Sequence, residues 1–172
     1  ASDEEVGNWD SLLTAGADGG NVFASYEIAM VKQLGGWKPR FLMVDDTAIT
    51  VLQKSVTGIG KLWYLPKGPG VKDVDQLVAI ADSLKSFAKK HGVFAVKIEP
   101  EIPRNEASDK TLRQKGLVKV SPIQPNFSTV ILDLAPSLDD VMSGLNQKGR
   151  HAIRRAERDG VITQVAPFNR DN

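Results

Sequence analysis

Apolar and polar positions along the chain follow two spacings, one typical of helices and one typical of strands. Helical spacing predicts helices over Glu4–Leu13, Ala24–Leu34, Val74–His91 and Ser108–Lys115, and a final helical region from Ser137 to Asp159. In the second helix, one stripe holds Ile28, Val31 and Leu34. In the long third helix, the stripe expected to be buried holds Leu77, Ile80, Leu84 and Phe87. Asp73 and Gly92 are suited to cap the two ends of this long helix.

Short apolar runs bounded by turn residues predict the strands. They cover Arg40–Val44, Ile49–Val56, Lys61–Leu65, Val93–Ile98, Leu117–Val120, Thr129–Leu132 and Val161–Val165. The turns between the first three are short, which predicts an antiparallel meander, and the fourth is expected to be a buried strand. Helices before a meander, then helix and strand in alternation, indicate a mixed α/β (α+β) fold. Because the last strand begins close to Asn172, we expect the chain to be the amino-terminal portion of a longer protein.

Composition excludes several classes of protein. The 172 residues are 41% hydrophobic and 25% charged, which is ordinary for a globular domain and argues against disorder. There is no Cys, so a disulfide scaffold and a Cys nucleophile are excluded, and with only two His we expect no metal site and no cofactor. The net charge is +1, so a polyanion would need a local basic patch. No apolar run is long enough to span a bilayer, and a soluble cytoplasmic protein is the working hypothesis.

Such a basic patch lies in the final helical region, where Arg150, Arg154 and Arg158 recur four residues apart and share one helix face. Guanidinium groups bind phosphates through paired hydrogen bonds, so contact with phosphate or with a tRNA backbone is one interpretation. The other is a solvated helix face balanced by Glu157 and Asp159, and composition alone favours it.

Other charged residues allow two interpretations each. Lys32 ends an otherwise apolar helix, where it can complement the helix C-terminus or point into a cleft. Lys67 lies in a Gly- and Pro-rich turn that lacks the spacing of a phosphate loop; it is a candidate for the rim of a cleft. Glu99 flanks Pro100 at the end of a predicted strand and is a second candidate for that rim. No nucleophile stands out, and the catalytic residues stay unassigned.

Taken in order, several stretches resemble the Fem-type (FemABX) aminoacyltransferases. The matching stretches are Ser25–Lys32, Gly36-Trp37-Lys38-Pro39, Lys67-Gly68-Pro69, Lys97-Ile98-Glu99-Pro100-Glu101, Gln124-Pro125, Ser128–Leu134 and Lys148–Val161. The resemblance implies two GNAT-like (N-acetyltransferase-like) lobes, each a mixed sheet with flanking helices. Residues 1–136 would form the first lobe, on the acceptor side, and residues 137–172 the linking helix and first strand of a truncated second lobe.

The resemblance also implies an activity, partners and site residues. Such enzymes move an amino acid from aminoacyl-tRNA to the stem-peptide amine of a UDP-linked or lipid-linked muropeptide precursor, in peptidoglycan cross-bridge synthesis. The lysine matching Lys32 contacts the acceptor diphosphate, and Arg150, Arg154 and Arg158 match a basic helix that meets tRNA or forms a hinge. At most peripheral membrane association is expected, and the fragment alone is expected to be inactive.

Two alternatives stay open. One is a non-catalytic module that binds a nucleotide sugar or tRNA. The other is an acyl-CoA-dependent N-acetyltransferase, which would carry an Arg/Gln-x-x-Gly-x-Gly/Ala loop for the CoA pyrophosphate at a helix N-terminus; the sequence has no such loop.

Overall fold

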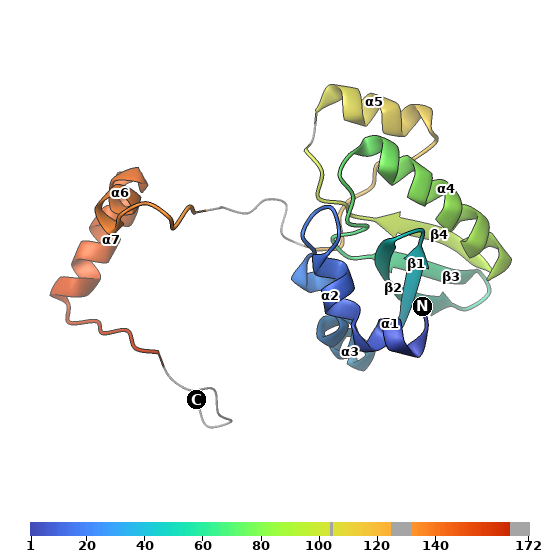
Figure 1. The fold of residues 1–172 in the computed structure, drawn as a ribbon, viewed down its shortest axis with the longest axis horizontal. Coiled ribbons are helices and arrows are strands. Elements are labelled where there is room, and N and C mark those ends of the chain that lie inside the picture. The colour runs from blue at the N-terminus through green and yellow to red at the C-terminus, as the bar shows by residue number, and fades with distance from the viewer. Residues whose placement is uncertain (104, 125–131, 166–172) are drawn as a thin grey trace. The chain divides into compact units, whose positions relative to one another are not determined.

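The computed structural model describes residues 1–103, 105–124 and 132–165. Contacts divide the chain into two units, Ala1–Phe127 and Ser128–Asn172, and each is described by itself (Figure 1). The assignment of residues 1–136 and 137–172 to two lobes stays a prediction.

The first unit is built on a four-stranded sheet in the order β1-β2-β3-β4. Strands β1 (Lys38–Val44), β2 (Thr47–Val56) and β3 (Gly60–Leu65) run antiparallel, and the predicted meander is therefore confirmed. Strand β4 (Val93–Ile98) pairs parallel with β3, because the chain returns through the long helix α4 (Val74–Lys90). This mixed sheet with flanking helices confirms the mixed α/β class.

Helix α4 covers one face of the sheet and closes the main core (Figure 1). Strand residues Ile49, Val51, Trp63 and Leu65 pack there against Leu77, Ile80 and Leu84 of α4. Phe87, expected in the buried stripe, is 43% exposed; its ring lies 4.2 Å from that of His91 and 5.9 Å from that of Trp63, centroid to centroid. Strand β4 is an edge strand, so the expectation that it is a buried strand is wrong: Phe94 is 51% exposed.

The opposite face is covered by the amino-terminal segment. It comprises α1 (Asp3–Gly7), α2 (Trp9–Thr14), the short 3₁₀ helix η1 (Val22–Ala24) and α3 (Tyr26–Leu34). The single helix predicted over Glu4–Leu13 is therefore two helices, which meet at Asn8. The buried Trp9 donates its Nε1–H to Thr50 Oγ1 at 2.7 Å, and Thr50 donates to the Ala24 carbonyl at 2.5 Å. This chain of hydrogen bonds fastens α2 and η1 to β2.

Helix α3 packs differently from the sequence prediction. Ala29 is its buried residue and lies against Leu52 and Tyr64. Of the predicted apolar stripe, Ile28 is half-buried, whereas Val31 and Leu34 face outward and are 57% and 89% exposed. A small residue at the contact lets the helix approach the sheet closely, and this turns the larger apolar side chains away.

Of the elements predicted after β4, some are present and others are not. Helix α5 (Glu106–Gln114) is present, but Leu117–Val120 and Val161–Val165 pair with no strand among the described residues. Most of Thr129–Leu132 lies outside the described residues. The final helical region is two helices, α6 (Leu138–Gly144) and α7 (Gln147–Arg158), because Asn146 caps the start of α7.

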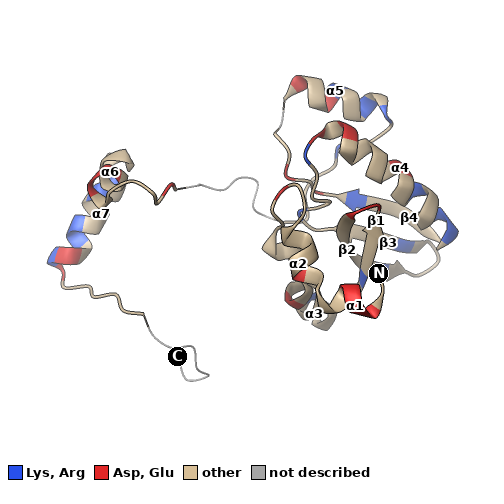
Figure 2. Cartoon of the chain, viewed as in Figure 1, with Lys and Arg blue, Asp and Glu red and all other residues tan. Residues whose placement is uncertain are grey.

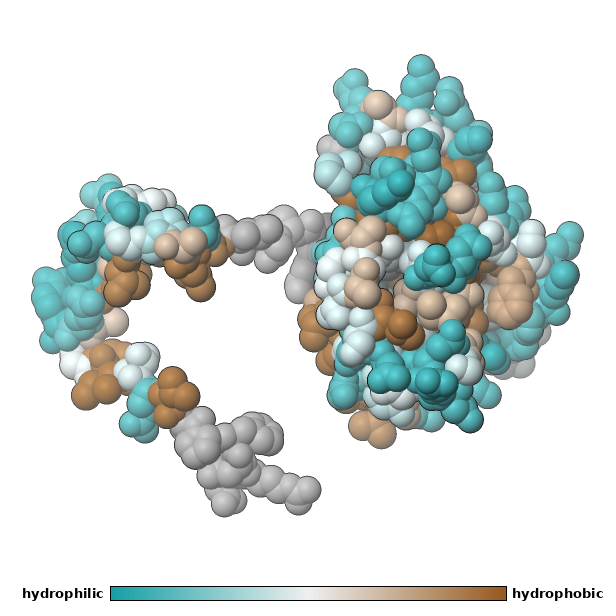
Figure 3. Space-filling view, viewed as in Figure 1, coloured by the Kyte–Doolittle hydropathy of each residue, from teal (hydrophilic) through white to brown (hydrophobic). Residues whose placement is uncertain are grey.

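Hydropathy is unevenly distributed in the second unit. Figure 3 shows hydrophobic residues gathered along one side of it and hydrophilic residues along the other. Across both units, none of the helices that the structure describes has the length and apolar character needed to cross a bilayer.

Candidate functional site

Strand alternation places a row of polar side chains on the α3 side of the sheet. Tyr64 of β3 and Lys97 of β4 are paired neighbours in the parallel ladder. Because successive side chains point to opposite faces, both lie on the face opposite to Trp63 and Ile98, which join the α4 core. Glu99, two residues beyond Lys97, continues this row at the carboxyl end of β4.

Glu99 is the most connected residue of the row. Its side chain is only 11% exposed. One carboxylate oxygen accepts a hydrogen bond from the Tyr64 hydroxyl at 2.8 Å, and the other accepts from the Ile123 backbone N–H at 2.5 Å. Lys97 Nζ lies 3.9 Å from the second oxygen and donates to the Ser121 carbonyl. Lys97 and Glu99 therefore hold residues 121–124 against the ends of β3 and β4.

The Tyr64 hydroxyl is held in its neutral form. Burial raises the pKa of Tyr64 well above its usual value, and the hydrogen bond to Glu99 and the negative charge of that carboxylate add to the increase. The side chain of Gln124, itself buried, is hydrogen-bonded to the same hydroxyl and acts in the opposite direction. Tyr64 is therefore a hydrogen-bond donor at neutral pH and is unsuited to act as a base.

Lys67 belongs to a second charged contact at the same end of the sheet. It has a left-handed backbone with φ of 48° and places Nζ 3.3 Å from Glu101 Oε1. The other Glu101 oxygen accepts a hydrogen bond from Asn21 Nδ2 at 2.7 Å. Asn21 also caps η1, since its Oδ1 accepts from the Phe23 N–H. Glu101 thus connects the turn that carries Lys67 to the start of η1.

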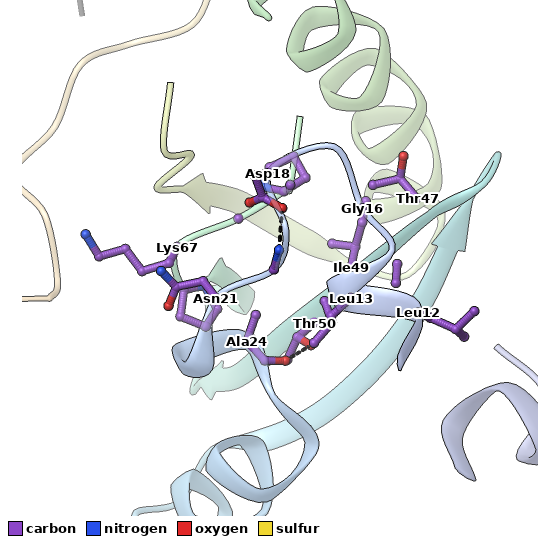
Figure 4. Close-up of a pocket in the computed structure, with 16 residues that line it drawn as sticks. Leu12, Leu13, Gly16, Asp18, Asn21, Ala24, Thr47, Ile49, Thr50 and Lys67 are labelled. Carbon is purple, nitrogen blue, oxygen red and sulfur yellow. Dashed lines mark hydrogen bonds between the residues drawn. The ribbon is translucent and has the colours of Figure 1, made fainter. Parts of the chain in front are cut away.

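Beneath this turn lies a small cavity of about 20 Å³ (Figure 4). That volume holds about one water molecule, so the cavity is too small for a substrate. Asp18 packs directly against Gly70, where a Cβ would come within 2.4 Å of Asp18 Oδ1, so a larger residue there would require the Asp18 side chain to move. Figure 4 shows the Lys67 side chain extending away from the other residues that line the cavity.

Lys32 lies in the last turn of α3, on the same side of the sheet as Tyr64. It is half-buried and forms no ion pair with any carboxylate in the described part of the chain. Its carbonyl accepts the Trp37 backbone N–H at 3.3 Å, and the Trp37 ring lies 5.9 Å from that of Tyr64. Lys54 Nζ lies over the Trp37 ring at 5.3 Å from its centroid. An ammonium without a carboxylate partner is available for an anion.

The three arginines of α7 are not equivalent. Figure 2 shows Lys and Arg residues along this helix, which is exposed on most sides. Arg150 donates to the carbonyls of Ser143 and Leu145 at the end of α6, so it joins the two helices. Arg154 and Arg158 form no ion pair within the described residues, whereas Arg155 is paired with Asp159 at 3.3 Å.

The fold thus brings some of the predicted residues together. Glu99 and Lys67 lie at one end of the sheet, each with partners within the protein, and their role at the rim of a cleft stays a prediction. Tyr64 and Gln124 were missed as members of this cluster. Alternation in the strand Lys61–Leu65 could have placed Tyr64 opposite Trp63, but no local pattern identifies Glu99 as its partner. The described residues bring together no group of three His, Asp or Glu side chains able to hold a metal ion.

The sequence profile of the FemAB family matches residues 11–116, which include the whole sheet, α3, α4 and the side chains of Tyr64, Lys97 and Glu99. The chain belongs to the FemAB family. This assignment agrees with the resemblance drawn from the ordered motifs.

Curated relatives give a second comparison. The chain is 25% identical over 154 residues to the lipid II:glycine glycyltransferase of Staphylococcus aureus, and the proteins of strains USA300 and COL match equally. The match covers 79% of this chain and 36% of the relative, so the chain spans about a third of the length of these proteins. Among solved structures, one titled as a probable acetyltransferase matches with a TM-score of 0.43 and 11% identity, covering 77% of this chain and 96% of that one.

Proposed function

We propose that this chain is the acceptor-binding part of an aminoacyltransferase that builds the peptidoglycan cross-bridge. The proposed reaction moves an amino acid from aminoacyl-tRNA to the stem-peptide amine of a muropeptide precursor, on the cytoplasmic side of the membrane. Membership of the FemAB family carries the proposal, and the match to a lipid II:glycine glycyltransferase supports it.

The reaction proposed for this enzyme does not require a nucleophilic residue, and the sequence offers no clear candidate for one. An aminoacyl ester is already activated, so aminolysis needs an attacking amine that is held close, neutral and aligned with the carbonyl. No covalent intermediate on the protein is required. The contribution of this chain would be to position a large anionic acceptor.

We assign to Lys32 the role of binding the diphosphate of the acceptor. The half-buried position of this lysine, with no carboxylate partner among the described residues, supports the assignment over a purely helix-capping role. Trp37, next to it in space through the backbone hydrogen bond, offers an aromatic surface for the rest of the acceptor. Lys67 and Glu99 are proposed to border this acceptor site.

For the donor, we assign to Arg154 and Arg158 the role of binding phosphates of the tRNA. Both lack ion-pair partners in the described part of the chain, whereas Arg150 is engaged with the end of α6. Arg150 is therefore proposed to contribute mainly to the hinge between α6 and α7.

The experiment is a titration of the chain with a soluble UDP-linked muropeptide. Lys32→Met should weaken binding by about 1.5–3 kcal/mol, the range for a hydrogen bond that involves a charged group. The matched control is Lys85→Met, which removes the same charge from the exposed side of α4. Unchanged binding with lower thermal stability in Lys32→Met would contradict the assignment and support helix capping. Tight binding of acyl-CoA instead of the muropeptide would contradict the proposed function itself.

A further inference from the structure

Strand β1 carries two basic residues on the side of the sheet that α4 covers. Arg40 lies directly opposite Val51 of β2, and Val51 belongs to the core beneath α4. Residues that lie opposite each other share a face, so Arg40 points to the α4 side, and so does Lys38, two positions earlier. Leu42 and Val44 pack against the same core, whereas Lys38 is exposed and Arg40 is half-buried. The basic end of this strand is therefore open to solvent, beside the covered part of the sheet.

Buried groups hold the guanidinium of Arg40 in place. Its Nε–H donates to Gln53 Oε1 at 2.7 Å, and the same oxygen accepts the Trp63 Nε1–H at 3.1 Å. Gln53 is 6% exposed and Trp63 1% exposed, so both are fixed by the packing around them. The two terminal nitrogens of Arg40 have neither a hydrogen-bond partner nor a carboxylate partner among the described residues. A guanidinium that is fixed through Nε presents its remaining N–H groups to an anion at little further cost in ordering.

A third cation and two aromatic rings lie on the same face. Lys61 lies two residues before Trp63 on β3, so it also points to the α4 side, where its Nζ donates to the His91 carbonyl at 2.8 Å. The rings of Phe87 and His91 lie 4.2 Å apart, centroid to centroid, and 5.9 Å and 6.3 Å from the ring of Trp63. Both Phe87 and His91 are exposed. We define the basic-aromatic surface as Lys38, Arg40, Lys61, Phe87 and His91.

Carboxylates are absent from the segments that form this surface. Residues 28–44, 47–72 and 83–98 include all five members and contain no Asp or Glu. The acidic turn Asp45-Asp46 joins β1 and β2 at their other end. Helix α1 is acidic and reaches the outer edge of β1, where the Ala1 ammonium donates to the Phe41 carbonyl at 3.1 Å. Within the described residues, however, no carboxylate forms an ion pair with Lys38 or Arg40, so a polyanion complements this surface.

We propose that the basic-aromatic surface binds single-stranded nucleic acid. Arg40, Lys38 and Lys61 would contact backbone phosphates, and a base would stack on the exposed ring of Phe87. Cations that follow a backbone and an aromatic ring that receives a base are the two parts from which single-strand sites are built. A duplex hides the faces of its bases, so stacking on Phe87 requires a single strand.

The dimensions of the surface agree with a short stretch of such a strand. Lys38, Gln53 and Trp63 are level with one another in the register of β1, β2 and β3. Neighbouring strands lie about 4.8 Å apart, so the surface extends about 10 Å from β1 to β3. At about 3.4 Å for each stacked nucleotide, this distance corresponds to roughly three nucleotides.

This surface is separate from the proposed acceptor site. Tyr64 and Lys32 lie on the α3 side of the sheet, whereas the basic-aromatic surface lies on the α4 side. The inference therefore goes beyond the proposed function and does not depend on it.

The test is fluorescence anisotropy of the full chain with short labelled oligouridylate and oligothymidylate. Both probes should bind, because they share the phosphates and base faces that the proposal uses. The double variant Lys38→Gln/Arg40→Gln should lose at least about tenfold in affinity at low salt. It should also flatten the slope of log affinity against log salt by roughly 1.4, since each lost contact to a single strand accounts for about 0.7.

Two further variants separate the contributions. Phe87→Leu keeps an apolar side chain beside Trp63 and removes the ring, so affinity should fall at least about fivefold with the salt slope unaltered. Lys38→Gln/Lys61→Gln leaves the contact between Arg40 and Gln53 intact and should flatten the slope as much as the first double variant does. A loss of stability caused by the Arg40 substitution therefore cannot produce the expected pattern.

The matched control is Lys85→Gln/Lys89→Gln, which removes two exposed lysines of α4. At about 100° per residue, both lie about 160° from Phe87 around the helix, on its far side. The control should keep its affinity and its salt slope. In the wild type, a photoreactive oligonucleotide that carries 5-iodouracil should cross-link to Phe87 or His91, as located by mass spectrometry.

Three results would overturn the proposal: no binding of either probe, equal losses in the control variant, or cross-links confined to other segments such as α7. A fourth is binding of phosphatidylglycerol vesicles that excess oligonucleotide does not displace, which would make this a lipid surface. Lys32 is untouched in every variant, so failure here leaves the UDP-muropeptide titration standing. Unchanged muropeptide binding in Lys32→Met would likewise leave the oligonucleotide result standing.

Discussion

The Tyr64 hydroxyl donates to the Glu99 carboxylate at 2.8 Å and joins the carboxyl ends of two parallel strands. The same carboxylate accepts the Ile123 N–H, so one side chain fixes a strand end and a loop that lies 24 residues further along the chain. Glu99 therefore acts as a structural anchor, whatever further part it takes in binding.

Removing this anchor should cost stability. Glu99→Ala leaves the Tyr64 hydroxyl and the Ile123 N–H without their acceptor, and we expect the free energy of unfolding to fall by about 2–3 kcal/mol. Urea denaturation measures this change. Glu101→Ala is the control: its carboxylate is 44% exposed, so the loss should be under about 1 kcal/mol. Equal losses in the two variants would show that Glu99 is no more important than a surface carboxylate.

Tyr64 should make the protein sensitive to alkali. Its pKa is raised in the folded state, so the folded chain holds this proton more tightly than the unfolded chain does. The resulting stabilisation is fully present below the unfolded pKa near 10 and is lost as pH rises through the higher folded pKa. In a Tyr26→Phe background, absorbance at 295 nm follows Tyr64 alone. Tyrosinate should form near pH 10 in urea but only at higher pH in the folded chain.

A companion variant tests the cause of that increase. Glu99→Gln removes the negative charge and keeps an acceptor, so the pKa of Tyr64 should fall toward 10 while remaining above it because of burial. An unchanged titration curve would leave burial as the whole explanation.

The hydrogen-bond chain under η1 gives a third prediction. Thr50→Val keeps the shape of the side chain but leaves the buried Trp9 Nε1–H without an acceptor and the Ala24 carbonyl without its donor. The expected cost is about 1–3 kcal/mol in thermal or urea unfolding. Thr47→Val, at the start of the same strand, should change stability by less than about 0.5 kcal/mol. A neutral Thr50→Val would mean that water replaces the hydroxyl.

The arginines of α7 should separate into two groups. Arg154→Gln/Arg158→Gln in the intact protein should weaken tRNA binding and flatten the slope of log affinity against log salt by roughly 0.7–0.9 per lost contact. Arg150→Gln should mainly lower the melting temperature, because it releases the Ser143 and Leu145 carbonyls. If the double variant has a lower melting temperature and its log affinity for tRNA has an unaltered dependence on log salt, the two arginines stabilise the helix and do not contact tRNA.

The strands of the meander and helix α4 could be predicted because their boundaries are local: turns at Asp45-Asp46 and Gly58–Gly60 and the cap Asp73 stop and start them within a few residues. The break at Asn8 and the outward stripe of α3 could not. Both features depend on how the helix packs on the sheet. A periodic pattern in the sequence identifies an apolar helix face but does not show whether another element covers that face. Leu117–Val120 has the composition of a strand, yet a strand also needs a partner, which composition does not supply.

The candidate site divides in the same way. Glu99 could be recognised as a carboxylate at a strand end, and Lys32 as a cation at a helix end. Tyr64 lies 35 residues before Glu99, and no spacing in the sequence links the two. Likewise, only the three-dimensional contacts distinguish Arg150, engaged with α6, from Arg154 and Arg158.

The parallel pairing of β3 with β4 has a consequence for the order of folding. The meander joins neighbours across short turns, whereas β4 reaches β3 only after the 17 residues of α4 have crossed the sheet. Pairings between distant segments form late, because the connecting chain must be ordered first. We therefore expect Tyr64 to be in place on a three-stranded sheet before Lys97 and Glu99 arrive beside it. The polar cluster would then be assembled at the final docking step, and a chain that stalls after the meander would keep its strands and lack its site.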